Sequence, residues 1–323
     1  MKPKTIKKVL RKKFNDFCKS IKDKDVRNLV LKNSIITGGS IASMLLREPV
    51  NDFDIYFKNA ETVKAVAEYY INDFSKSNSN FAIILTETID DLDGISRYKI
   101  KVQSDGIAVE EGFEYGEGPD VAENPDMYPD INGNMTNPVP CEDMSEFDCN
   151  EATDDNEDDA EDIEPPSKYR PIYLSSNAIT LSDKIQLIIR FYGSAEEIHK
   201  NYDFVHCTCY WESDTGKLTL PSEALAALLS KELIYRGSRY PLASIIRSRK
   251  FIQRGFTINA GQYLKMCIQL NSLDLTKLSV LEDQLTGVDA YYFINLLHAI
   301  PEKSIIDGSV DSEYIITLVD RFF

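Results

Sequence analysis

The spacing of apolar residues at the start of the chain predicts helices followed by a glycine turn. Between residues 5 and 32, apolar side chains recur at intervals of three and four, as on one face of a helix. We therefore expect one or two helices there. A short extended segment over residues 34–37 then leads to Gly38 and Gly39, and the apolar positions behind them predict a short helix over residues 40–46.

The pattern changes to alternation in the sequence DFDIYFK at residues 52–58, which predicts a strand. Asn59 can cap the helix that the spacing predicts next, over residues 61–74. Further strands are expected at residues 81–86, 98–102, 171–174, 202–211 and 217–220, and a further helix at residues 182–193. From residue 222 onward the periodicity is helical.

These elements predict an α+β protein in four parts. Residues 1–103 hold the N-terminal helices and the first part of a head in which helices flank a mixed β-sheet, and residues 167–221 hold the remainder of this head. Residues 104–166 interrupt the head as an insertion, and residues 222–323 form an all-helical C-terminal region. A chain of 323 residues is long enough for more than one core.

Charge is divided unevenly between the insertion and the rest of the chain. Residues 104–166 contain 22 acidic residues and no Lys or Arg, whereas the remainder holds all 36 basic residues and the other 30 acidic ones, a net charge of +6. Because the insertion is also rich in Pro, Gly and Asn, we expect it to be mostly disordered, with residues 107–114 extending a hairpin. The basic body could bind a polyanion such as nucleic acid, and the insertion could compete with it.

Composition is typical of a globular protein with no membrane partner. No window comes near the roughly 20 unbroken apolar residues that a membrane-spanning helix needs. The basic N-terminus has no apolar segment of the kind found in signal peptides. The six cysteines follow no pairing pattern, and His206, Cys207 and Cys209 lack a second ligand pair, so we interpret these three as core residues. We expect reduced thiols and a cytoplasmic location.

Two carboxylates on the predicted strand DFDIYFK are the leading candidates for chemistry. Side chains alternate along a strand, so Asp52 and Asp54 share one face, where like charges repel unless a cation lies between them. Such oxygen ligands suit Mg²⁺ or Mn²⁺. Upstream, Gly38, Gly39 and Ser40 form a turn into a helix N-terminus, whose free N–H groups and dipole can hold phosphate. The alternative for the two acids is a solvating role at a turn.

A third carboxylate on a neighbouring strand would complete a site for phosphoryl transfer with two metal ions. We favour Asp203, at the head of the predicted strand over residues 202–211. Its competitor is Asp105, which lies where the insertion begins. Asp203 is preferred because it belongs to a patterned, aromatic-rich segment.

The segment GGSIASMLLREPVNDFDIYF resembles the head motif of the DNA polymerase β-like nucleotidyltransferases, above all the class of CCA-adding enzymes and bacterial poly(A) polymerases. That class follows the pattern GG-x-V-R-D-x-L-L-G-x-x-x-x-D-x-D. Its glycines fall on Gly38 and Gly39 and its carboxylates on Asp52 and Asp54, without a gap. The resemblance covers about twenty residues and implies an NTP such as ATP as a ligand.

A second segment, YPLASIIRSRKFIQRGFTI, is similar to a nucleotide-binding helix of the same class. The positions in register are Pro241, Arg249, Gly255, Phe256 and Ile258. The resemblance implies a nucleotide-binding role for Arg249, and Arg247 stands one position away from another arginine of the class. A solvated basic face is the alternative. Ala42 and Ser43 replace an Arg-Asp pair of the class, a departure that affects base selection and tRNA use more than metal chemistry.

Together these features predict a metal-dependent nucleotidyltransferase. It would transfer NMP from an NTP to a hydroxyl acceptor, such as an RNA 3′ end, and release pyrophosphate. Asp52, Asp54 and Asp203 would hold the metal ions, and Gly38, Gly39, Ser40, Arg247 and Arg249 would bind the nucleotide. The chain also resembles phage-encoded proteins, which implies a viral protein in the host cytoplasm. The alternative is a retired transferase fold that serves as a binding or virion-associated module.

Overall fold

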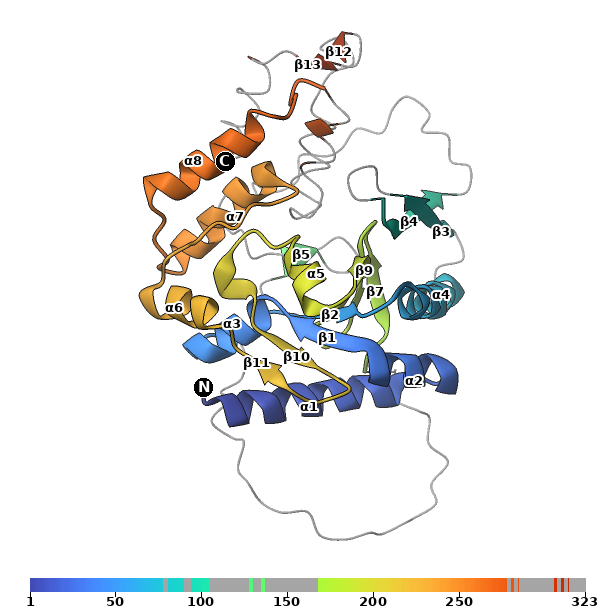
Figure 1. Cartoon of the computed structure of the whole chain (residues 1–323). Coiled ribbons are helices and arrows are strands. Elements are labelled where there is room, and N and C mark those ends of the chain that lie inside the picture. The colour runs from blue at the N-terminus through green and yellow to red at the C-terminus, as the bar shows by residue number, and fades with distance from the viewer. Residues whose placement is uncertain are drawn as a thin grey trace, which may run out of the picture.

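A computed structural model describes most of the chain outside the acidic insertion (Figure 1). The described residues are 1–77, 81–89, 94–104, 128–129, 135–136, 168–277, 280–281, 284, 305–306, 309–310 and 313. Asp105 and nearly all of the predicted disordered insertion lie outside this set, apart from the short paired strands β5 (Tyr128–Pro129) and β6 (Met135–Thr136).

The centre of the fold is a seven-stranded sheet with the order β11-β10-β1-β2-β9-β8-β7. Its strands are β1 (Ser34–Thr37), β2 (Phe53–Phe57), β7 (Pro171–Leu174), β8 (Ala178–Leu181), β9 (Ile185–Tyr192), β10 (Tyr210–Glu212) and β11 (Leu218–Thr219). The sheet is mixed, because β2 and β9 pair in parallel while the other neighbours are antiparallel.

One face of this sheet packs on the N-terminal helices. These are α1 (Pro3–Ser20), α2 (Lys24–Asn33) and α4 (Ala60–Ser77), and α4 leads into the hairpin of β3 (Phe81–Ile89) and β4 (Ser96–Ser104). The apolar stripe of α1 buries Phe14 and Phe17. The rings of Phe14 and Trp211 on β10 pack in a T-shaped arrangement, with their centroids 5.3 Å apart. Figure 1 shows α1 beneath the sheet, on the side away from the C-terminal helices.

The opposite face of the sheet is covered less completely. The short helix α5 (Ala195–His199) and the 3₁₀ turn η3 (Val205–Cys207) follow β9 in the chain. Ile35 and Tyr56 pack there against Ala195 and Ile198 in a small apolar cluster. The helix α3 (Gly39–Leu46) connects β1 to β2 and buries Ile41 in the main core.

The C-terminal part begins with α6 (Ser222–Ser230), α7 (Pro241–Gln253) and α8 (Ala260–Leu270). Arg254, at the end of α7, donates to Glu48 through Nε at 3.1 Å and to the Ser43 hydroxyl at 3.0 Å. Lys231 lies 3.4 Å from the same Glu48 carboxylate. These contacts fix α7 against the loop that leads to β2. Further on, β12 (Ile305–Ile306) pairs with β13 (Ser309–Val310).

The chain is an α+β protein with a helix-flanked mixed sheet and a helical C-terminal part, as the sequence predicts. None of the helices among the described residues is long and apolar enough to cross a membrane.

One predicted helix, at residues 182–193, is wrong: the segment forms β9, and the preceding strand β8 was missed. The run IQLIIRF contains three consecutive apolar residues, Leu187 to Ile189, and such a run does not distinguish a strand from a buried helix. The hairpin turn before it is also unusual. Asp183 and Lys184 adopt positive φ angles of 62° and 60° in a turn that contains no glycine.

The predicted strand over residues 202–211 is also wrong, apart from its end in β10. Its first half turns into η3 and bonds to a distant segment. The Val205 N–H donates to the Ile234 carbonyl at 3.0 Å, and the Asp203 carbonyl accepts from Arg236 N–H at 2.9 Å. The aromatic and β-branched residues that suggested a strand instead pack inside the core.

Candidate active site

Asp54 lies near the middle of the sheet, on the face opposite α1. It belongs to β2, and its Cα partners are Thr37 on β1 and Gln186 on β9. Its carboxylate is half-buried, whereas Asp52, just before the strand, is exposed. Burial and the nearby charge of Asp52 raise the pKa of Asp54, and Lys250 on α7 opposes this shift. A cation between the two carboxylates, which the sequence predicts, would relieve this repulsion.

The turn before α3 brings the backbone directly against Asp54. Gly38 has a φ of 94°, and a Cβ atom at this position would lie 3.0 Å from Asp54 Oδ2 and 3.4 Å from the Tyr202 hydroxyl. Only glycine fits this close approach without strain. At Gly39 a Cβ would meet nothing within 4 Å, so open space lies in front of the turn.

The N-terminus of α3 has unused hydrogen-bonding capacity. No side chain caps the helix at Gly38, which leaves its first N–H groups without a side-chain acceptor. The Ser40 side chain is buried, and its hydroxyl has no hydrogen-bond partner among the described residues. A buried hydroxyl without a partner is costly, so this geometry suits an anion that accepts from both Ser40 and the helix N-terminus.

A polar and aromatic group lies beside Asp54 on the same face. The Thr37 hydroxyl donates to the Cys209 carbonyl at 3.0 Å and lies 2.8 Å from His199 Nε2. The His199 ring packs against Tyr202, with ring centroids 4.9 Å apart. Burial, with the charge of Arg236, lowers the pKa of His199 to about 4, so the ring is neutral at pH 7. His199 is therefore a buried support for Thr37 in β1.

Asp203 is buried and paired with an arginine. Arg247 NH1 lies 2.5 Å from Asp203 Oδ2. Sequence reasoning gave these two residues separate tasks, and the structure joins them in one ion pair. A carboxylate held in this way is already neutralised, so it could serve a metal ion only if Arg247 released it.

Three cations of α7 and its C-terminal end act on acids of the head. Arg247, Lys250 and Arg254 follow helical spacing. Arg247 pairs with Asp203 and Arg254 with Glu48, and the charge of Lys250 acts to lower the pKa of Asp54. Arg249 lies off this row, and both Arg249 and Lys250 are exposed. The sequence already places Lys250 and Arg254 in one basic run with Arg247 and Arg249, for which phosphate contact and a solvated face are the alternatives. The spacing of three and four between Arg247, Lys250 and Arg254 was the available signal for the row.

Comparison with known proteins places the chain in a family. The model of the Gabija anti-defense 2 (Gad2) family matches residues 8–231. The chain belongs to the Gad2 family. A relative, Gabija anti-defense 2 of Bacillus phage SPbetaL7, is 24% identical over 107 residues. That alignment covers 32% of this chain and only 27% of the relative's length.

Two solved structures resemble this Gad2 family member in outline. The CCA-adding enzyme of Bacillus stearothermophilus, in complex with CTP, is 12% identical at a TM-score of 0.35, with 93% of this chain and 52% of that chain covered. The Thermotoga maritima CCA-adding enzyme, complexed with tRNA, is 13% identical at a TM-score of 0.35, with 94% and 65% covered. Likenesses of this degree carry no argument about function.

The Gad2 family match includes some of the predicted site residues and not others. It spans Gly38 to Ser40, the carboxylates of Asp52 and Asp54, and Asp203. The cations of α7 lie beyond its end at residue 231. The carboxylate pair and the turn before α3 thus lie within the family match, whereas the basic face of α7 lies outside it.

The described residues fit one divalent ion better than two. Among them, no three His, Cys, Asp or Glu side chains come together as a metal site. Asp52 and Asp54 provide one pair of carboxylates, and Gln186 stands next to Asp54 on β9. This donor set consists of hard oxygen atoms, which suits Mg²⁺ or Mn²⁺ rather than zinc.

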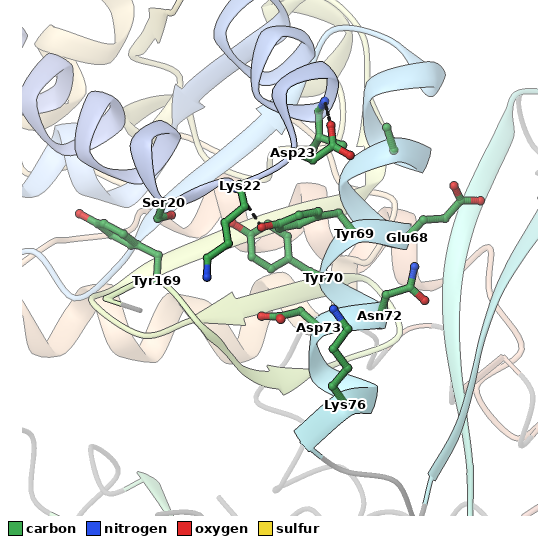
Figure 2. A pocket seen from close by; sticks show the side chains of 12 residues that line it. Ser20, Lys22, Asp23, Glu68, Tyr69, Tyr70, Asn72, Asp73, Lys76 and Tyr169 are labelled. Carbon is green, nitrogen blue, oxygen red and sulfur yellow. Dashed lines mark hydrogen bonds between the residues drawn. The ribbon is translucent and has the colours of Figure 1, made fainter. Parts of the chain in front are cut away.

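A cavity of about 570 Å³ lies elsewhere, between α2, α4 and Tyr169 (Figure 2). Lys22 and Lys76 line it together with Asp73 and Glu68, so charges of both signs are present. The helices α2 and α4 pack on the sheet face opposite Asp54. This cavity is separate from the candidate site.

Proposed function

We propose that this Gad2 family member is a nucleotidyltransferase that uses an NTP and Mg²⁺ or Mn²⁺ to counteract the Gabija defence for which its family is named. The observation that carries the proposal is the pairing of Asp52 and Asp54 with the uncapped N-terminus of α3, where the buried Ser40 hydroxyl has no partner. Carboxylates for a cation and donors for an anion thus meet at one turn.

The two halves of this turn suit the two parts of a metal–triphosphate ligand. Donors at a helix N-terminus bind phosphate through N–H groups and the helix dipole. The carboxylates of Asp52 and Asp54 favour a divalent cation, which neutralises their mutual repulsion. Open space in front of Gly39 leaves room for the ligand. A plain structural turn would need neither the paired acids nor an unpaired buried hydroxyl.

In the proposed reaction, an acceptor hydroxyl attacks the α-phosphorus and loses its proton to water. The bond from the α-phosphorus to the oxygen it shares with the β-phosphate breaks, so that pyrophosphate leaves. A bound Mg²⁺ would neutralise charge on the phosphates and lower the barrier to attack. Ser40 and the α3 N-terminus would orient the triphosphate, and Lys250, near Asp54, would attract anionic substrate. Under this proposal the acceptor belongs to the defence machinery or to RNA in the cytoplasm of the infected host.

The test is a double variant, Asp52→Asn with Asp54→Asn, compared with Glu68→Gln combined with Asp73→Asn as a charge-matched control outside the site. Purified proteins are incubated with each α-labelled NTP and a lysate that contains the Gabija system. We expect label transfer and protection of phage with the control, and neither with the double variant. Full transfer by the double variant would exclude the mechanism.

A second candidate function is a binding module without transferase activity. It is favoured by the ion pair between Asp203 and Arg247 and by the absence of an acidic side chain on β9, the parallel neighbour of β2. In that case the double variant would still protect phage. Nucleotide with Mn²⁺ would raise the melting temperature of the wild-type protein without any transfer.

The role proposed for Asp203 is tested by substituting each partner of its ion pair with Arg247 in turn. If Asp203 serves the metal ion, Asp203→Asn should lower the transfer rate on the order of a hundredfold, whereas Arg247→Met should preserve transfer. If the pair is structural, both changes should lower the melting temperature by similar amounts.

The proposed role of Arg249 in nucleotide binding requires a raised KM in Arg249→Ala.

A further inference from the structure

Gln186 occupies the position next to Asp54 on the neighbouring strand. The parallel register of β2 and β9 pairs the two residues directly. Neighbouring strands lie about 4.8 Å apart, and paired residues point to the same face of a sheet. Ile185 and Leu187, on either side of Gln186, belong to the core on the opposite face. The Gln186 side chain is partly exposed and forms no hydrogen bond with the rest of the described chain.

We propose that Gln186 is the third side chain that faces the divalent ion, and that its neutral amide keeps the metal site weak until a nucleotide arrives. This inference rests on the proposed function. Amide oxygens are accepted ligands of hard cations, but the affinity of such sites rises with the number of charged ligands. With Asp52 and Asp54 alone carrying charge, a triphosphate must supply the remaining negative oxygens.

The neutral amide also avoids additional charge repulsion in the metal-free protein. A third carboxylate would stand beside two that already repel one another, on a half-buried part of the sheet. Gln186 avoids this repulsion. Metal affinity and stability of the metal-free protein are therefore expected to change in opposite directions when the amide becomes an acid.

The test compares Gln186→Glu and Gln186→Leu with Thr180→Glu. Thr180 is the partner of Gln186 on β8, so Thr180→Glu adds the same charge one strand further from Asp54. Mn²⁺ binding without nucleotide is measured by calorimetry, and melting temperatures are measured in EDTA and in Mn²⁺. Gln186→Asp is a second variant in case the longer acid prevents folding in EDTA.

We expect Gln186→Glu to bind Mn²⁺ on the order of tenfold more tightly than wild type and to melt at a lower temperature in EDTA. Gln186→Leu should bind no more tightly than wild type, and Thr180→Glu should show no gain. Adding Asp54→Asn to Gln186→Glu should remove the gain. The inference is overturned if neither acidic variant at position 186 binds Mn²⁺ more tightly than Thr180→Glu.

Failure of the proposed function would look different. If Gln186→Glu gains Mn²⁺ affinity while the wild-type protein transfers no nucleotide, the role of Gln186 stands and the transferase proposal fails. If the wild-type protein transfers nucleotide but the acidic variants gain no affinity, the transferase proposal stands and Gln186 does not face the ion.

Discussion

The two faces of the seven-stranded sheet differ although the same strands build both. Along β2, Phe53, Ile55 and Phe57 enter the main core, while Asp54 and Tyr56 point to the opposite face. The first face is sealed by α1, α2 and α4. The second holds a small apolar cluster and the polar group around Thr37 and Asp54.

This difference separates stability from chemistry within a single strand. Burial of apolar side chains on the α1 face provides the main driving force for folding. The Asp54 face works against folding, because it gathers like charges and leaves the buried Ser40 hydroxyl without a partner. Such costs are typical of sites where a ligand supplies the missing interactions. Substitutions on the two faces should therefore act oppositely on stability and activity.

The largest expected effect on stability comes from removing a buried side chain on the core face of β2. Phe57→Ala removes a fully buried ring, and the free energy of unfolding should fall by about 3–5 kcal/mol. Asp54→Asn, on the other face of the same strand, should leave that free energy unchanged or raise it in metal-free buffer, because a like-charge pair disappears. Urea denaturation of both variants measures the contrast. A large loss of stability in Asp54→Asn would contradict it.

The next effect concerns two buried histidines. Burial lowers the pKa of both His199 and His206 to about 4. His199 has a partner in Thr37, whereas both ring nitrogens of His206 lack one among the described residues. Its ring lies 4.5 Å from that of Phe251 and 4.8 Å from that of Phe256, between centroids. His206 therefore contributes a desolvated polar ring to an otherwise aromatic part of the core.

The pKa of such a histidine is lower in the folded protein than in the unfolded protein, where it is about 6.5. Above about pH 6.5 the ring is neutral in both states, so it does not change the free energy of unfolding. Stability is lost as the pH falls from there toward about 4, by on the order of 3 kcal/mol for His206. His206→Leu should remove this part of the pH dependence, which urea denaturation between pH 4 and pH 8 would measure. Identical slopes in the variant and the wild-type protein would show that His206 does not titrate in this range.

A smaller effect is expected at the turn before α3. Gly38→Ala forces a Cβ to 3.0 Å from Asp54 Oδ2 at a φ of 94°, and should cost about 1–3 kcal/mol as well as Mn²⁺–nucleotide binding. Gly39→Ala is the matched control for stability in the nucleotide-free protein, because its Cβ meets nothing within 4 Å. Melting temperatures without nucleotide compare the two variants, and nucleotide binding by Gly38→Ala is compared with the wild-type protein. Equal behaviour of both variants would mean that the close approach at Gly38 is unimportant.

The parts of the site that could be predicted from sequence are those fixed by local spacing. Gly38 and Asp54 come together because one short helix joins their strands. The place of Gln186 beside Asp54 could not be found in this way, because it depends on the pairing of β2 with β9. The sequence shows Lys250 as one of several cations on its helix, but its effect on Asp54 depends on how α7 docks. The same non-local pairing explains why β9 itself was predicted as a helix. An apolar run gives no information about its partners.

After the insertion the described chain resumes at Lys168, next to the turn between β8 and β9. Lys168 lies 3.2 Å from Asp183, which also pairs with Lys13 of α1 at 2.7 Å. The next residue, Lys184, accepts a hydrogen bond from Phe53 N–H at 2.8 Å, directly after Asp52. Lys168 is therefore held near the turn whose next residue, Lys184, contacts the start of β2. The covalent chain therefore keeps the 22 acidic residues of the insertion at a high local concentration around the rest of the protein, which has a net charge of +6.

The smallest and most salt-sensitive prediction follows from this proximity. Replacing residues 104–166 with a short Gly/Ser linker should strengthen RNA or DNA binding at low ionic strength, if the insertion competes for the basic body as a nucleic-acid mimic. The gain should fade as salt screens the charges. A variant of full length with amides in place of the acids controls for the loss of chain, and should show the same gain. Unchanged affinity at low salt in both variants would mean that the insertion serves solubility alone, because a competing polyanion cannot be removed without releasing the surface that it occupied.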